Sequence, residues 1–445
     1  MKNMKNFLLF ALLGQQSISF GQQPILSKWI INTTGKTASY WENTATPGPG
    51  NPPVFVFNTT TDSADVQRVC YTSDSVYVKA TGMTDNMGKY NNPGSSLAQT
   101  YVYCFPRNPV VPATKTAAPA NFAVGALLNG IPIFGRASGT SWNGTNNGFG
   151  GPQIWNTEVY LAEGVALDTA FGGHPQQQGQ YHTHAKPYRL YEGYPTNQHS
   201  PIIGFSFDGY PVYGPYGYSA PTNSASTVAR IKSGYSLRNI TVRHTLPNGT
   251  VLSASQYGPN VSATYPIGTY CEDYEWLASN NGDLDAYNGR FCVTPEYPAG
   301  TYAYFTTLTS ALVPQYPYYI GPYYYGTPNT KNFNGGCLTR TMPTSGLTCV
   351  SNSVTGIFEM NKQQAFAVFP NPNDGSFTID VNTAFSTQKY SIRIYNLLGA
   401  LVFSDNLNNE TYQVNLKAQA NAGVYFVYLM DEKGTMTGVQ KIVVE

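Results

Sequence analysis

Charged side chains are scarce in this 445-residue chain, where they make up 11% of the residues, against roughly 25% in an ordinary soluble protein. The 25 lysines and arginines nearly balance the 24 aspartates and glutamates, which leaves a net charge of +1. Because no basic excess is present to neutralise phosphates, we expect no nucleic-acid partner. Long amphipathic helical patterns are also missing, which excludes coiled coils and helical bundles.

Turn-forming and aromatic residues are plentiful instead, with 43 glycines, 31 prolines and 35 tyrosines. Their distribution predicts an all-β class, mostly strands with a few short helical turns near 158–168 and 273–280. The length and the 41% apolar content allow more than one domain. We expect a large β-rich domain over 22–350, a linker over 351–364, and a small C-terminal β-sandwich over 365–445.

The N-terminus has the features of a signal peptide. An apolar run over 7–13 follows two lysines and is too short to span a bilayer as a helix. The small residues Ser19 and Gly21 then predict cleavage after residues 1–21, so that the mature chain starts at Gln22. The alternative is a buried N-terminal strand. No later run is apolar enough for a transmembrane segment, and we expect none after cleavage.

The six cysteines suit an exported chain, because an oxidising compartment favours disulfides. Their spacings lack the two-residue gap of zinc-ribbon and redox motifs, so a structural role is preferred over metal binding. Sequential pairing closes the shortest loops, and we therefore expect the bridges Cys70–Cys104, Cys271–Cys292 and Cys337–Cys349.

The histidines are concentrated in one short segment. Four of the five are His174, His182, His184 and His199. In an extended segment His182 and His184 would project from the same face, about 6.5–7 Å apart along the backbone, which suits two ligands of one metal ion. Neutral imidazole binds zinc, copper, iron or nickel. His174 follows two glycines that allow the chain to fold back, and His199 is the fourth candidate ligand.

Two carboxylates near this segment, Asp168 and Asp208, are candidates to complete the metal site or to hold the second imidazole nitrogens. Asp208 also precedes Gly209 in what reads as a tight turn between strands. The predicted cofactor is a transition metal ion, copper or zinc. The alternative is that these histidines are ordinary hydrogen-bonded structural residues.

Other site types find less support. Asp283 and Asp285 are spaced as in an EF-hand, but Asn288 replaces the required glycine and Thr294 replaces the bidentate glutamate. A calcium site of another kind stays open. The sequence holds no Ser-His-Asp order, glycine-rich phosphate loop or HExxH motif, so protease and nucleotide-binding functions have no support.

The last 80 residues alternate apolar and polar positions in several short runs, for example at Ile392 and Ile394, which is typical of half-buried strands. FPNPNDGSFTID, IYNLLGALVF and AGVYFVYLMDEKG…QKIVV resemble the C-terminal sorting domain of type IX secretion substrates of the Bacteroidetes. This resemblance implies handling by the type IX machinery, export through periplasm and outer membrane, and release or attachment at the cell surface. A carbohydrate-binding sandwich is the alternative.

Four further segments resemble the YHYH domain family: GGHPQQQGQYHTH, HSPIIGFSFDGYPVYGPYG, LDAYNGRFCVTPEYPAGTYAYF and YPYYIGPYYYG. With the upstream ALLNGIPIF the resemblance spans about 60–326. Thr183 stands where the family has tyrosine, and its side chain would face away from both neighbouring histidines on a strand. The resemblance implies that the histidine segment and the DGYPVYGP segment belong to one domain, but it implies no activity.

We therefore expect a secreted or cell-surface protein that binds a metal ion through its histidine cluster, and a metal-dependent enzyme of unassigned reaction is left open. The alternative is an extracellular glycan-binding, protein-binding or adhesion module without catalysis. A third interpretation is a structural surface protein with no site.

Overall fold

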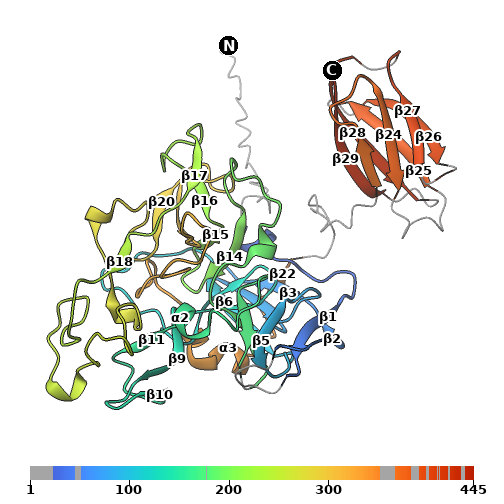
Figure 1. The fold of residues 1–445 in the computed structure, drawn as a ribbon. Helices are drawn as coiled ribbons and strands as arrows, with labels where there is room; N and C mark the ends of the chain where they lie inside the picture. The colour runs from blue at the N-terminus through green and yellow to red at the C-terminus, as the bar shows by residue number, and fades with distance from the viewer. Residues whose placement is uncertain are drawn as a thin grey trace, which may run out of the picture. The chain divides into compact units, whose positions relative to one another are not determined.

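The protein was analysed as a computed structural model. It describes residues 24–45, 52–176, 178–350, 366–381, 390–396, 400–407, 409, 411–418, 421–431 and 436–445. The predicted signal peptide, 1–21, and the predicted linker, 351–364, lie outside the described residues. The chain divides into two compact units, Met1–Asn352 and Ser353–Glu445. Strands dominate both units (Figure 1), so the predicted all-β class is confirmed.

An eight-stranded mixed sheet is the centre of the first unit. Its central strands are continuous apolar runs that are buried along their whole length, as expected where both faces of a strand are covered. In spatial order the strands are β12 (Gly173–Pro175), β13 (Tyr181–Thr183), β8 (Pro132–Phe134), β7 (Ala123–Leu127), β14 (Ile202–Ser206), β15 (Pro211–Tyr213), β21 (Thr301–Phe305) and β20 (Gly289–Cys292).

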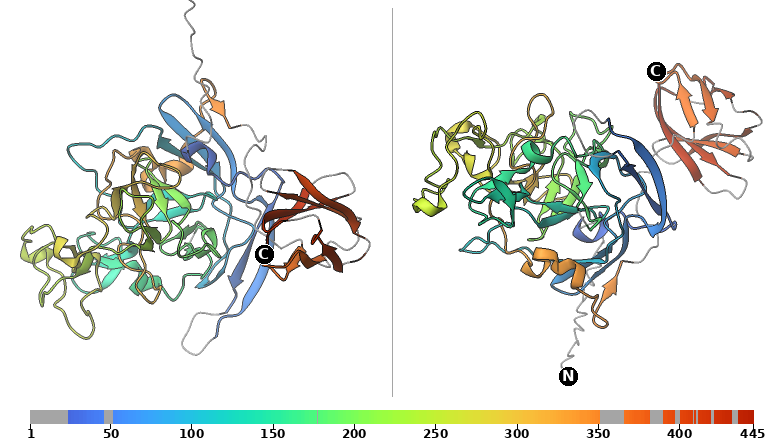
Figure 2. Two further views of the ribbon diagram at one scale, coloured as in Figure 1. Left: turned by 90° about the horizontal axis from the view of Figure 1, so that it is seen from above. Right: turned by 60° about the horizontal axis from the view of Figure 1, so that its bottom comes forward.

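Smaller sheets surround this one, and Figure 2 shows the hairpin of β1 and β2 at the margin of the first unit. One sheet has the order β22 (Thr348–Cys349), β3 (Val66–Tyr71), β4 (Ser75–Ala80) and β6 (Tyr101–Pro106). Another has the order β2 (Phe55–Ser63), β1 (Thr37–Asn43) and β5 (Lys89–Pro93). The others are β10 (Asn147–Phe149), β9 (Ala137–Trp142) and β11 (Asn156–Glu158), and the pairs β16 (Tyr216–Tyr218) with β17 (Val228–Arg230) and β18 (Tyr235–Leu237) with β19 (Tyr274–Trp276).

Helices in the described part of the chain are short: α1 (Pro24–Ser27), α2 (Val159–Glu163) and α3 (Gly336–Thr339). The helical turn predicted near 158–168 corresponds to α2, which ends five residues earlier. The helical turn predicted near 273–280 corresponds to two 3₁₀ turns, Cys271–Asp273 and Ala278–Asn280, with strand β19 between them. The remaining 3₁₀ turns are Tyr188–Leu190, Ala254–Gln256 and Thr330–Gly335.

Buried tyrosines supply much of the core and of its polar contacts. Tyr103 and Tyr324 are fully buried, and their hydroxyls donate to the carbonyl oxygens of Gly130 and Val124, at 3.0 Å in each case. A tyrosine buries a large apolar ring while its hydroxyl still finds a hydrogen-bond acceptor. The chain can therefore build a large interior with few charged groups, which accounts for its composition.

The cysteine pairing differs from the expected one. Cys70 is bonded to Cys349, directly opposite it on the neighbouring strand β22. All three expected bridges, Cys70–Cys104, Cys271–Cys292 and Cys337–Cys349, are therefore wrong, and the other four cysteines are free buried thiols. Strand order explains the error, because β4 separates Cys70 on β3 from Cys104 on β6. The shortest-loop argument considers chain entropy and not which strands are neighbours.

The second unit is a small sandwich of two antiparallel sheets. Ile392, Ile394, Val427 and Leu429 are fully buried between them, as the alternating pattern predicts. Residues 390–396 and 401–407 form a hairpin of two strands, and residues 397–399 between them are not described. The sheets have the orders β23 (Phe366–Phe369), β24 (Ser376–Val381), β27 (Thr411–Asn415) and β26 (Leu401–Leu407), β25 (Tyr390–Asn396), β28 (Gly423–Met430), β29 (Met436–Val444).

Candidate metal centre

Two short antiparallel strands bring three of the predicted histidines together. In the pairing of β12 with β13, His174 lies directly opposite His182, and His184 follows two residues later. One ring nitrogen from each of these three residues lies within 4.8 Å of those from the other two. Thr183 points away from them, since its hydroxyl donates to the carbonyl oxygen of Phe171. We call His174, His182 and His184 the histidine cluster.

A glycine makes this return of the chain possible. Gly172 has a φ of +59°, and a Cβ atom there would lie 1.6 Å from the carbonyl oxygen of Ala185. Its own carbonyl oxygen accepts the backbone N–H of His184 at 3.0 Å. Any side chain at this position would push the two strands apart. Gly172 is therefore required for the cluster to form.

Each imidazole of the cluster is held through its Nδ1 atom by an oxygen. The Nδ1 atoms of His182 and His184 lie 3.0 Å and 3.1 Å from the carbonyl oxygens of Gln180 and Gly135. His174 Nδ1 lies 3.2 Å from Oδ1 of Asn92 on β5. Because these oxygens only accept, they assign the proton of each ring to Nδ1. The three Nε2 atoms therefore carry lone pairs, and those of His182 and His184 are 2.9 Å apart.

Glu163 is a fourth possible ligand that the sequence analysis did not identify. Its Oε2 atom lies 3.0 Å from Nε2 of His174 and 3.5 Å from Nε2 of His184. It is the last residue of α2, whose first turn is capped by the carboxylate of Glu158. The available signal was its position in the helical turn predicted near 158–168, shortly before His174.

Burial sets the protonation of the cluster. It lowers the pKa of His182 well below the ordinary value, and the two neighbouring imidazoles lower it further. Burial also lowers the pKa of His184, to about 4. For Glu163 burial alone raises the pKa, but the adjacent His174 and His184 outweigh it and leave the pKa lowered. At neutral pH His182 and His184 are therefore neutral imidazoles beside one carboxylate, the form that binds cations.

The two predicted carboxylates do not join the cluster. Asp168 is buried, and its Oδ1 accepts the backbone N–H groups of Ala170 and Phe171 at 2.8 Å and 2.7 Å, while its Oδ2 accepts the hydroxyl of Tyr181. It supports the turn that leads into β12. The second imidazole nitrogens, which Asp168 or Asp208 was expected to hold, are held by the oxygens named above.

Asp208 lies at the tight turn between β14 and β15, on the other side of the eight-stranded sheet's centre from β12 and β13. Its Oδ2 accepts the hydroxyl of Tyr304 at 2.7 Å and the backbone N–H of Gly326 at 2.9 Å. Burial raises the pKa of Asp208 above its ordinary value, although these hydrogen bonds oppose the rise. The geometry gives Asp208 a structural role in closing this turn.

His199 is also separate from the cluster, although it is close in sequence. Its ring lies among aromatic side chains, with centroids 4.9 Å from those of Tyr213 and Tyr218. Its Nδ1 lies 2.9 Å from the carbonyl oxygen of Ser200. Among the described residues, the group of possible metal ligands contains three histidines and not His199.

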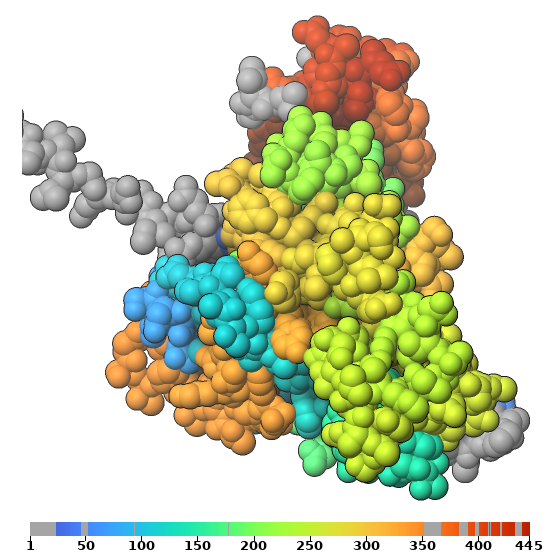
Figure 3. Space-filling view, turned by 90° about the vertical axis from the view of Figure 1, so that its left-hand side faces the viewer, coloured from blue at the N-terminus to red at the C-terminus, as the bar shows by residue number. Residues whose placement is uncertain are grey.

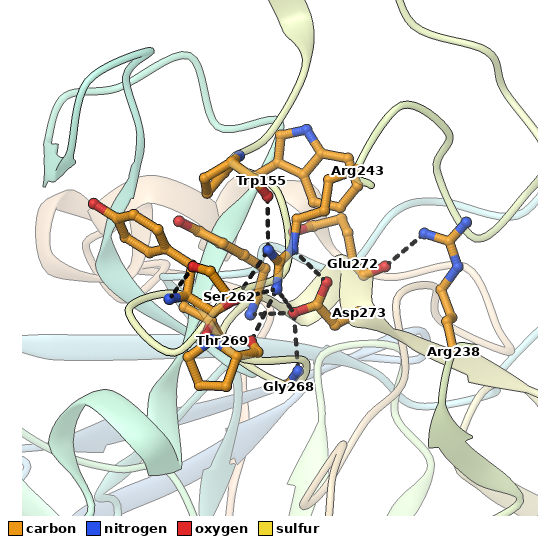
Figure 4. Close-up of polar contacts among 12 residues, drawn as sticks. Trp155, Arg238, Arg243, Ser262, Gly268, Thr269, Glu272 and Asp273 are labelled. Carbon is orange, nitrogen blue, oxygen red and sulfur yellow. Dashed lines mark hydrogen bonds and ion pairs between the residues drawn. The ribbon is translucent and has the colours of Figure 1, made fainter. Parts of the chain in front are cut away.

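A second buried polar cluster lies in the long connection between β18 and β19, which covers much of the face shown in Figure 3. Arg243 and Asp273 are fully buried and form a two-pronged ion pair, with N···O distances of 2.7 Å and 2.8 Å (Figure 4). The remaining Arg243 donors reach the carbonyl oxygens of Pro259, Tyr265 and Pro266. We call Arg243 and Asp273 the arginine cluster, and its completeness indicates a structural role.

The loop considered for calcium is also internally bonded. Oδ1 of Asp285 accepts the backbone N–H of Tyr287 at 2.9 Å and the hydroxyl of Tyr302 at 2.8 Å. Oδ2 of Asp283 accepts the backbone N–H of Lys232 at 2.8 Å. Both carboxylates therefore accept hydrogen bonds from groups of the same chain, which indicates a structural role.

Comparisons with known proteins identify two domains. The model of the YHYH protein family matches residues 102–318. The model of the secretion system C-terminal sorting domain matches residues 367–445. The resemblances expected from the sequence are thereby confirmed. The sorting domain marks the protein for type IX secretion, and so for release or for the cell surface.

Individual relatives add little. An endo-acting ulvan lyase of Formosa agariphila is 40% identical over 65 residues, which is 15% of this chain and 12% of that protein. A solved structure of PorZ, a surface component of the type IX secretion system of Porphyromonas gingivalis, is 9% identical with a TM-score of 0.15. That match covers 92% of this chain and 59% of PorZ, and it supports no inference about fold. In the described part of the chain, no helix has the length and apolarity needed to cross a membrane.

Proposed function

Because the chain carries a YHYH domain followed by a secretion sorting domain, we propose that it is an exported metal-binding protein. Its YHYH domain binds one transition metal ion, copper or zinc. The ligands are the Nε2 atoms of His174, His182 and His184 and a carboxylate oxygen of Glu163. The ion is either a structural element or the centre of an enzyme whose reaction is unassigned.

One observation carries this proposal: the Nε2 atoms of His182 and His184 face each other at 2.9 Å. A hydrogen bond across this gap would need a proton on one Nε2, and that ring would then be an imidazolium because its Nδ1 already donates to a carbonyl oxygen. Without that proton two lone pairs repel each other in a buried site. A cation between them turns the repulsion into coordination.

The contact of His174 with Glu163 supports the same conclusion. Nε2 of His174 lies 3.0 Å from Oε2 of Glu163, while Nδ1 of the same ring is already held by Asn92. A lone pair and a carboxylate oxygen at this distance again favour a cation. Three imidazole nitrogens with one carboxylate oxygen suit zinc and copper, and the carboxylate partly neutralises a divalent charge.

The partners of the Nδ1 atoms also match a metal site. Histidine ligands commonly donate their second ring N–H to a carbonyl or amide oxygen, which fixes the tautomer and aims the free nitrogen at the ion. All three rings of the histidine cluster have such a partner. The three rings are thus oriented for metal binding before any ion binds.

The test is the metal content of the full-length chain, purified without a histidine tag and dialysed against zinc. We expect one zinc ion per chain, measured by inductively coupled plasma mass spectrometry. We expect none in the double variant His182→Ala/His184→Ala. His244→Ala is the matched control, since this histidine stacks on Tyr257 outside the cluster. A wild-type chain without zinc, or a double variant that retains it, contradicts the proposal.

A second candidate function is an extracellular glycan-binding module. The sheet β2-β1-β5 carries Lys89, Trp41 and Phe57 in a row, with Lys89 Nζ 4.3 Å from the centroid of the Trp41 ring and Phe57 50% exposed. Exposed aromatic rings stack on sugars. This function predicts glycan binding that Trp41→Ala/Phe57→Ala abolishes and His182→Ala/His184→Ala leaves unchanged, as measured on an array of polysaccharides.

A further inference from the structure

We propose that the metal keeps a coordination position for a small oxygen- or nitrogen-donor ligand from solvent, on the side of Glu163 and His174. The centre would then be reactive and not purely structural. This inference rests on the proposed function, because it requires an ion held by the three Nε2 atoms. It adds which ligands the ion accepts and from which direction they arrive.

One side of the histidine cluster is closed by the core. The ring of Phe134, a residue that is 8% exposed, lies 4.1 Å from the ring of His182 and 5.9 Å from that of His184, measured between centroids. Strand β8, which ends with Phe134, pairs with β13 next to it. The side chain of His184 is only 3% exposed. No ligand can reach the ion through this packed layer without displacing core residues.

Exposure increases toward the opposite side. The side chain of His174 is 11% exposed and that of Glu163 is 24% exposed. The chain reaches the surface directly after Glu163, where Val165 is 83% exposed. Nε2 of His174 is itself buried, so solvent reaches the donors past the partly exposed carboxylate of Glu163, and a ligand that binds the ion there need not move the core.

An apolar side chain lies beside this exposed side. Phe149 on β10 is 82% exposed and lies against Gly139, whose backbone N–H also holds the Glu163 carboxylate. Such a residue favours the approach of ligands that bring an apolar or ring-shaped body along with their donor atom.

The spacing of the donors indicates incomplete coordination. With metal–nitrogen distances of about 2.05 Å, donors at right angles lie about 2.9 Å apart and tetrahedral donors about 3.3 Å apart. The distance from His182 Nε2 to His184 Nε2 is 2.9 Å, that from His174 Nε2 to Glu163 Oε2 is 3.0 Å, and that from His184 Nε2 to Glu163 Oε2 is 3.5 Å. Two of these three distances correspond to near-right angles, which are typical of five or six ligands. The four donors found among the described residues then leave a position for solvent.

The experiment loads the full-length chain with one equivalent of Co²⁺ or Cu²⁺ and titrates it with azide. We expect a new saturable absorption band from azide on the ion, and proton relaxation of water by the copper form that shows a bound, exchanging water. A chain that binds one equivalent of metal but shows neither signal contradicts this inference alone. A chain that binds no metal contradicts the proposed function and this inference together.

A variant pair tests the direction of approach. Glu163→Ala removes the ligand on the exposed side, so we expect a gain of about one exchanging water and at least as strong an azide band, with metal still bound by three imidazoles. Glu192→Ala is the control, since this carboxylate is 50% exposed and pairs with Arg189. Equal water relaxation in Glu163→Ala and the wild type would contradict an opening on this side.

Discussion

The arginine cluster and the histidine cluster are both buried groups of polar side chains, but they differ in how their atoms are paired. Every donor of Arg243 meets a carboxylate or carbonyl oxygen of its own surroundings. In the histidine cluster the Nδ1 atoms are paired in the same way, whereas the Nε2 atoms face one another or a carboxylate.

We take this difference to separate a structural group from the proposed binding group. Buried polar atoms in folded proteins nearly always have partners, and a site where several lack them needs an explanation. The long connection between β18 and β19 needs an internal anchor, and the arginine cluster provides it without any ligand. Under the proposed function, a cation completes the histidine cluster.

The comparison predicts the largest effect for Arg243→Met in the metal-free protein. Asp273 would remain buried without its partner, so we expect the free energy of unfolding to fall by about 3–5 kcal/mol. His182 is also buried but belongs to no ion pair. His182→Gln should therefore change the free energy of unfolding by less than about 1 kcal/mol, since removing the facing lone pairs offsets the lost packing. Urea unfolding followed by tryptophan fluorescence measures both, because all five tryptophans lie in the first unit.

The surface variant Arg189→Met, in which only an exposed ion pair with Glu192 is lost, serves as the control and should cost about 0.5 kcal/mol or less. Equal losses for Arg243→Met and His182→Gln in the absence of metal would remove the distinction between the two clusters.

Zinc should stabilise the first unit through the histidine cluster and not through the arginine cluster. At roughly 100 times its dissociation constant, zinc should raise the free energy of unfolding by about 2.7 kcal/mol in the wild type. The same increment is expected in Arg243→Met, because the sites share no residues. It should vanish in His182→Ala/His184→Ala. Equal stabilisation of this double variant, measured by the same unfolding assay, would place the zinc elsewhere.

Asn92 should tune the metal affinity through His174. Asn92→Leu removes the acceptor that holds Nδ1 of this ring, so we expect zinc to bind about 10–100-fold more weakly. Asn92→Asp keeps an oxygen at this position and should restore most of the affinity. Isothermal titration compares both with Asn58→Leu, a control on β2 of the same sheet. Unchanged affinity in Asn92→Leu would show that the ring is held without this contact.

The smallest effect concerns Glu272, beside the arginine cluster (Figure 4). Burial raises its pKa from 4.5 to about 7, although Asn156 and Arg136 oppose the shift. Because the folded state holds this proton at a higher pH than the unfolded state, stability should fall as the pH rises from 4.5 to 7. Glu272→Gln should remove this decline, which amounts to a relative gain of about 1–2 kcal/mol at pH 8 compared with pH 5.

Urea unfolding at the two pH values, with the wild type measured alongside, gives this difference directly. A stability difference between Glu272→Gln and the wild type that is the same at pH 5 and pH 8 would mean that Glu272 is ionised in the fold without penalty.

Local patterns in the sequence predicted what local geometry decides. Alternation predicted the buried faces of the second unit at Ile392 and Ile394, and the HxH spacing placed His182 and His184 on one face. Glu163 was missed because its approach to the histidines depends on where α2 packs, and no spacing records that. His199 was included because it is near in sequence, yet an aromatic pocket holds it elsewhere. The cysteine pairing failed similarly, since the order of β22, β3, β4 and β6 decides it.

The most direct test of the central claim is anomalous X-ray diffraction from crystals of the full-length protein grown with one equivalent of zinc. The account predicts a single strong peak at the zinc edge within about 2.0–2.2 Å of the Nε2 atoms of His174, His182 and His184. A peak at His199 or at another group, or crystals whose three Nε2 atoms surround no anomalous scatterer, would contradict it.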